Sequence, residues 1–91
     1  MYKKVAWSRF KKDIKSYRNN KRVLKELEKI IDMICFKIKL SPKNKDYELK
    51  GDFLWIRDCH IFPNVLLVYE IDDEQKTVRF IRIGSHSDLF K

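Results

Sequence analysis

The sequence predicts an α+β fold in which a helical hairpin packs on a mainly antiparallel four-stranded sheet, in the order β-α-α-β-β-β. Two apolar patterns with helical spacing lie in the first half of the chain, and three strand-like apolar runs lie in the second half. The 91 residues are expected to form one domain, residues 1–91, because so short a chain cannot supply two separate cores.

The N-terminal half predicts a strand and then two helices. The aromatic segment 2–7 is expected to form the first strand, followed by Ser8 as a helix N-cap. Apolar residues at helical spacing within residues 10–17 predict the first helix. A broad apolar stripe over residues 23–38 predicts the second helix. We expect Ser41-Pro42 to end it, because proline restricts the residue before it and has no backbone N–H to donate.

The C-terminal half predicts a β-meander after a polar loop. Residues 43–51 are rich in lysine and lack periodicity, which is typical of a functional loop. Strands are expected at residues 53–57, 65–71 and 78–83, with a hairpin turn at 72–76. Because residues 65–69 are apolar on both faces, that strand is expected to be central and covered.

The charge balance indicates a polyanionic partner. The chain has 21 Lys and Arg against 13 Asp and Glu, a formal net charge of +8. The alternative is a basic surface that serves only solubility. No apolar run approaches the ~20 residues of a spanning helix, so no membrane association is expected. The N-terminus has no apolar stretch typical of a signal peptide, and a cytoplasmic location is expected.

The two histidines are the candidate catalytic groups. His60 follows Arg57 and His86 follows Arg82, each near the end of a predicted strand. Cleaving RNA without a metal requires a base for the 2′-hydroxyl, an acid for the leaving 5′-oxygen and cations for the phosphate, and histidine suits both proton transfers. The alternative is that each histidine is a structural residue at a strand end.

Other candidate chemistry is weaker. Zinc binding by Cys35, Cys59, His60 and His86 lacks the usual ligand spacing, and two cysteines are too few for a disulfide framework. A Cys59–His60 thiol pair is rejected because adjacent strand residues point to opposite faces. The acidic run 72–74 is more typical of a solvated turn than of a metal site.

Four segments resemble the YafQ-type toxins of the RelE superfamily: residues 10–15, 46–51, 57–69 and 82–90. The R-D-x-H-I motif and the G-S-H-S-x-L-F ending are the most specific of these features. The resemblance implies a microbial ribonuclease-like fold and metal-independent cleavage of mRNA in the ribosomal A site, with no cofactor. It also implies inhibition by a small acidic antitoxin in a hetero-oligomer.

The resemblance also implies roles for individual residues. His86 would be the general acid and His60 the base or an orienting group. Arg82 and Lys50 would bind phosphate, and Phe90 would stack on a base. Further substrate-binding candidates are Arg57, Lys45 and Asp46.

Two positions depart from the family pattern. Tyr47 stands where the family usually has histidine, and Asn64 where it usually has aspartate after proline. Tyr47 can orient a 2′-hydroxyl, and can act as a base only if cations lower its pKa. Asn64 can hold a hydrogen bond but cannot accept a proton. These departures leave open a catalytically weakened protein that acts by binding antitoxin or ribosome, or a ParE-like inhibitor of a protein target.

Overall fold

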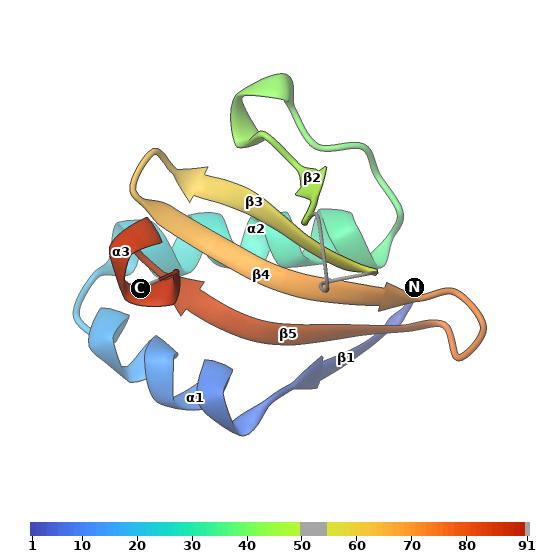
Figure 1. Ribbon diagram of the computed structural model, residues 1–91, viewed down its shortest axis with the longest axis horizontal. Coiled ribbons are helices and arrows are strands. Elements are labelled where there is room, and N and C mark those ends of the chain that lie inside the picture. The colour runs from blue at the N-terminus through green and yellow to red at the C-terminus, as the bar shows by residue number, and fades with distance from the viewer. Residues whose placement is uncertain (50–54, 91) are drawn as a thin grey trace.

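The computed structural model describes residues 1–49 and 55–90. Its elements, in order, are β1 (Lys3–Ala6), α1 (Ser8–Ile14), the 3-10 turn η1 (Lys15–Tyr17), α2 (Lys21–Cys35), the 3-10 turn η2 (Pro42–Asn44), β2 (Tyr47–Glu48), β3 (Ile56–Phe62), β4 (Val65–Asp72), β5 (Thr77–Gly84) and α3 (His86–Leu89). The strands form one sheet in the order β1-β5-β4-β3-β2, with α2 behind it and α3 in front (Figure 1). None of the helices in these two ranges has the length and apolar character needed to cross a bilayer.

The predicted α+β class and mainly antiparallel sheet are confirmed. Only β1 and β5 run parallel, and the other described strand pairs are antiparallel. The expected count of four strands is wrong, because residues of the polar loop form β2 and give a fifth. A strand of two polar residues has no apolar alternation, so the sequence pattern contains no signal for it.

Helix α2 forms where its apolar stripe meets the sheet. The Asn20 side chain accepts a hydrogen bond from the Val23 backbone N–H at 3.1 Å and so caps the first turn. The helix ends at Cys35 and not at Ser41, because Lys37 has a φ of 59° that an α-helix does not accommodate. Ile38 therefore lies outside the helix and is 53% exposed.

The core lies between α2 and one face of the sheet. Strand β4 is central, and its residues 65–69 are buried as predicted. Leu67 and Tyr69 belong to the cluster that packs against α2, whereas Leu66 and Val68 are buried on the other face. Phe36 and Trp55, which sit in apolar stretches of the sequence, are exposed.

Strand β3 lies later in the chain than predicted. The expected strand at residues 53–57 overlaps it only at Ile56 and Arg57, and residues 53 and 54 lie outside the described residues. The strand continues to Phe62 and has an irregularity between His60 and Phe62. His60 therefore lies within a paired strand.

Truncating the centre of β4 tests this account of the core. We expect Leu67→Ala to lower the free energy of unfolding by about 2–5 kcal/mol, because Leu67 is fully buried and its loss leaves a cavity. The matched Ile38→Ala removes a largely exposed side chain and should change it by less than about 1 kcal/mol. Urea denaturation of both variants provides the measurement. Equal losses would contradict this position of the core.

Candidate active site

Strand alternation places the side chains of β3 on two opposite faces of the sheet. Cys59 and Ile61 point into the core beneath α2. Asp58 and His60 alternate with them and lie on the opposite face. An acid and a histidine two residues apart thus share the face that α2 leaves uncovered.

The strand register places further polar residues beside this pair. Residues on this face form two neighbouring rows across the sheet, one consisting of Tyr47, Asp58, Val68 and Arg82 and the next of His60, Leu66 and Gly84. The chain then enters α3 two residues after Gly84, which brings His86 to the same end of the sheet.

His60 is held in one tautomer by the turn that follows it. Its Nδ1 lies 3.2 Å from the Pro63 carbonyl oxygen. A carbonyl only accepts hydrogen bonds, so Nδ1 carries the proton and the neutral ring keeps its lone pair on Nε2. The buried Asn44 amide donates to the His60 carbonyl at 2.7 Å and holds the backbone. This arrangement leaves Nε2 available to accept a proton.

His86 and Phe90 lie together on α3. The Ser85 hydroxyl accepts a hydrogen bond from the Asp88 backbone N–H at 3.2 Å and caps this short helix. Because His86 and Phe90 are four residues apart, they share one side, and their ring centroids are 5.1 Å apart. His86 is exposed and Phe90 is 38% exposed. The structure thus presents an imidazole and an aromatic ring at one rim.

Arg82 is anchored by α1. Its Nε donates to Asp13 Oδ2 at 2.7 Å and its Nη2 to Asp13 Oδ1 at 3.2 Å, while the Ile83 backbone N–H donates to the same carboxylate at 3.1 Å. The hydrogen bonds with Asp13 raise the pKa of Arg82. A cavity of about 280 Å³ lies beside the pair. Asp13 was not among the predicted site residues, because an acid within a basic helix carries no signal for a distant partner.

Asp58 is a second residue at this site that sequence reasoning missed. Partial burial raises the pKa of the Asp58 carboxyl, while the charges of His60 and His86 act to lower it. Asp58 lies two residues before His60 on the same face of β3. The signal was present in the sequence, because residues i and i+2 of a strand share a face.

The remaining predicted residues have different places. Tyr47 is 65% exposed on β2. Asn64 is exposed in the turn after Pro63, and Lys45 is exposed with a φ of 46°. Lys50 lies outside the described residues.

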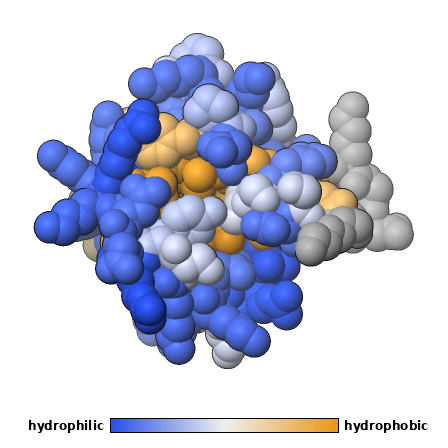
Figure 2. Space-filling view, turned by 90° about the vertical axis from the view of Figure 1, so that its left-hand side faces the viewer, coloured by the Kyte–Doolittle hydropathy of each residue, from blue (hydrophilic) through white to orange (hydrophobic). Residues whose placement is uncertain are grey.

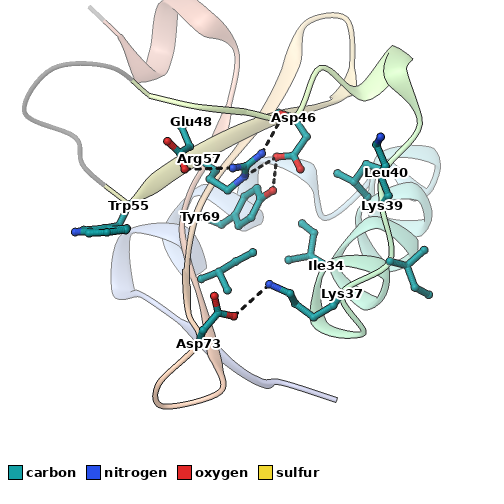
Figure 3. A pocket seen from close by; sticks show the side chains of 12 residues that line it. Ile34, Lys37, Lys39, Leu40, Asp46, Glu48, Trp55, Arg57, Tyr69 and Asp73 are labelled. Atoms are coloured by element: carbon teal, nitrogen blue, oxygen red, sulfur yellow. Dashed lines mark hydrogen bonds and ion pairs between the residues drawn. The ribbon is translucent and has the colours of Figure 1, made fainter.

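Arg57 and Asp46 lie on the opposite face from the histidines. Arg57 Nε donates to Asp46 Oδ1 at 3.2 Å, and the Tyr69 hydroxyl donates to the same oxygen. The group borders a cavity of about 380 Å³ between the sheet and the C-terminal end of α2 (Figure 3). The sequence predicts that Arg57 and Asp46 bind substrate. In the structure their side chains bind each other.

The cysteines lie apart from the histidine face. Cys35 and Cys59 are fully buried in the core and are free thiols. Burial raises the pKa of Cys59 to about 12, so the thiol stays protonated at neutral pH. Across residues 1–49 and 55–90, no three His, Cys, Asp or Glu side chains converge on a possible metal position.

The end of the molecule that carries the β3–β4 turn and α3 has a mixed surface. Figure 2 looks onto this end and shows hydrophobic side chains gathered in the middle, with hydrophilic side chains around them. An apolar patch with a polar surround can accept a flat base while cations contact its phosphate.

This fold is that of a bacterial toxin family. The family described as "Bacterial toxin of type II toxin-antitoxin system, YafQ" matches residues 2–91. The chain belongs to the YafQ family of toxins, which confirms the resemblance seen in the sequence.

Three relatives illustrate the similarity. The mRNA interferase toxin YafQ of Escherichia coli strain K12 is 29% identical over 82 residues, covering 89% of this chain and 87% of that protein. The crystal structure of a metal-bound toxin from Helicobacter pylori is 39% identical, covers 99% of this chain and 100% of that chain, and has a TM-score of 0.91. The toxin in the crystal structure of the E. coli DinJ–YafQ complex is 27% identical over the whole of both chains, with a TM-score of 0.87.

The raised pKa of Asp58 predicts a pH-dependent stability. Because the folded state holds the Asp58 proton more tightly than the unfolded chain, ionisation of Asp58 opposes folding as pH rises above its usual pKa. We expect Asp58→Asn to melt at a higher temperature than the parent near about pH 7.5, and the difference to vanish near about pH 3.

Asp73→Asn is the control of opposite sign. Hydrogen bonds from Tyr2 and Lys37 lower the pKa of Asp73, so its charge favours folding above its usual pKa. This variant should melt slightly lower than the parent at neutral pH. A melting temperature for Asp58→Asn at or below that of the parent at neutral pH would contradict the assignment.

Proposed function

We propose that this protein is an mRNA interferase that cleaves ribosome-bound mRNA without a metal ion, with His60 and His86 transferring the protons. One observation carries the proposal. The two histidines lie at one end of the sheet, and His60 shares with Asp58 the face that α2 leaves uncovered. The name of the E. coli relative, an mRNA interferase toxin, supports the same activity.

The proposed reaction is an attack by the 2′-hydroxyl on the adjacent phosphate. Nε2 of His60 accepts the 2′-hydroxyl proton as the O2′–P bond forms. The P–O5′ bond breaks, and the His86 imidazolium donates its proton to the departing O5′. The products are a 2′,3′-cyclic phosphate and a 5′-hydroxyl, and each histidine ends in the protonation state from which the other began. Two such proton transfers each contribute ~10²–10⁴ in rate.

The neighbouring side chains bind and orient the RNA in this proposal. Arg82 contacts the phosphate as charge develops on it. Phe90, beside His86, stacks on a base. Lys45 and Lys50 add cations from the polar loop. Tyr47 takes the position next to Asp58 and orients the 2′-hydroxyl through its own hydroxyl.

The two departures from the family pattern bear on the rate. Asn64 follows Pro63, whose carbonyl holds His60, and its amide cannot accept a proton. Tyr47 replaces an imidazole by a phenol. We propose that these changes lower the rate and leave most of the proton transfer to His60 and His86.

The same proposal implies an antitoxin as binding partner and the cytoplasm as cellular location. A translating ribosome places the protein in the cytoplasm. The net charge of +8 favours an acidic antitoxin that covers the cations of the site, and an E. coli relative has been crystallised in a complex with DinJ. The toxin would then be held inactive in a hetero-oligomer.

Removing His86 is the direct test of the mechanism. We expect His86→Ala to lower single-turnover cleavage of a programmed mRNA on ribosomes by ~10² or more, because O5′ would leave unprotonated. Ribosome binding and melting temperature should stay near those of the parent, since His86 is exposed.

His60→Ala should also slow cleavage, and Phe36→Ala, at an exposed site far from the histidines in the sequence, should not. Cleavage by His86→Ala within a few-fold of the parent, at unchanged stability, would overturn its role as the acid. A parent protein without detectable cleavage would instead favour the catalytically weakened binding protein.

A second prediction concerns charge. Binding of the free protein to ribosomes should weaken between low salt and ~200 mM salt, because phosphate contacts release counterions. Adding the acidic antitoxin should abolish cleavage by competing for the same cations. Pelleting with ribosomes across a salt series measures the first effect, and binding that does not change with salt would refute it.

A further inference from the structure

Besides the β2–β3 ladder and the Leu49 N–H, which donates to the Ile56 carbonyl at 2.8 Å, side-chain hydrogen bonds hold the segment that carries Tyr47. Before it, the buried Asn44 side chain donates to the His60 carbonyl at 2.7 Å. Beside it, the Asp46 carboxylate accepts hydrogen bonds from Arg57 Nε at 3.2 Å and from the Tyr69 hydroxyl. Arg57 Nη2 also donates to the Asp46 carbonyl at 3.1 Å. Both the side chain and the backbone of Asp46 are therefore held.

Tyr69 is a rigid hydrogen-bond donor to Asp46. Its side chain is 1% exposed within the core of β4, so the hydroxyl has little freedom to move. Burial and the contact with Asp46 raise the pKa of Tyr69, which keeps the hydroxyl protonated as a donor. Burial alone would lower the pKa of Arg57, but its contacts in the network, above all the hydrogen bond to Asp46, outweigh burial and raise it. Tyr69 and Arg57 thus both stay protonated and able to donate to Asp46.

Tyr47 and Asp46 lie on opposite faces of the sheet. Strand β2 has only two residues, Tyr47 opposite Asp58 and Glu48 opposite Arg57. Its alternation places Asp46 and Glu48 on the side of Arg57 and Tyr47 on the side of Asp58 (Figure 3 shows the Asp46 side). A ladder of two polar residues, extended by the Leu49–Ile56 backbone bond, specifies its register only weakly, and a slip of one residue would turn Tyr47 away from the Asp58 face.

We propose that Asp46, Arg57 and Tyr69 form a positioning network, which acts through β2 to hold Tyr47 at the active site from the opposite face of the sheet. None of the three contacts the RNA in this arrangement. The kinetic part of the inference rests on the proposed cleavage activity, and the structural part does not.

A double-mutant cycle tests whether Asp46 acts through Tyr47. We expect Asp46→Ala to lower single-turnover cleavage by about tenfold or more, because a displacement of about 1 Å at a reacting group can cost ~10²-fold. In a Tyr47→Ala background the same change should have less than about a twofold effect, since nothing remains to be positioned. Glu48→Ala is the matched control. Glu48 is on the same strand pair, but its side chain is 69% exposed and its ion pair with Arg57 Nη1 is long, at 3.7 Å. It should stay within about twofold of the parent.

A second readout does not depend on cleavage. Cross-strand nuclear Overhauser effects between Tyr47 and Asp58 should be present in the parent and in Glu48→Ala and absent in Asp46→Ala. Tyr69→Phe keeps the ring in the core and removes only the hydroxyl that donates to Asp46, so it tests the same network if Asp46→Ala does not fold. It should weaken the same Overhauser effects.

The outcomes separate the two proposals. Full-strength Tyr47–Asp58 Overhauser effects in both Asp46→Ala and Tyr69→Phe overturn the network, whatever the rates. Equal fold-losses from Asp46→Ala in the parent and in the Tyr47→Ala background also overturn it, because they indicate an effect independent of Tyr47. If the parent does not cleave and Asp46→Ala still abolishes the Overhauser effects, the proposed function is overturned and the network stands.

Discussion

The register between β3 and β4 determines which side chains lie together at the candidate active site. His60 pairs with Leu66 and Cys59 with Leu67. Both leucines are almost completely buried, one on each face of the central strand. A shift of one residue would bring His60 under α2 and expose Cys59, so packing on both faces opposes it. The position of the histidine is therefore a consequence of how the core packs.

The two histidines of the candidate site are held in place by different numbers of contacts. His60 lies in a paired strand and is held by the Pro63 carbonyl and the Asn44 amide. His86 lies on a four-residue helix capped by Ser85. In the proposed mechanism, a firmly held base and a more exposed acid suit a substrate that arrives on a large partner, because the partner can complete the arrangement around the exposed group. The raised pKa of Asp58 shows that the folded chain accepts an unfavourable charge at this face.

Much of the fold could be predicted because its signals are local. A continuous apolar run identified the central strand at 65–69, and the apolar stripe identified α2. The same stripe extended the predicted helix too far, because apolar residues continue beyond Cys35 after the backbone has turned at Lys37. Strand β2 was missed because its hydrogen bonds to β3 come from a segment without any apolar pattern.

The sequence by itself determined the α+β class, the family and the two histidines, because periodicity and short motifs are properties of neighbouring residues. Only the tertiary structure decided the partners of the charged groups. Arg82 binds Asp13, 69 residues earlier in the chain, and Arg57 binds Asp46 on the face opposite the histidines. Arg57 and Arg82 look alike in the sequence, because each lies shortly before a histidine. Strand alternation and register give them different faces, and a pattern read along one strand does not contain the residue that lies across the sheet.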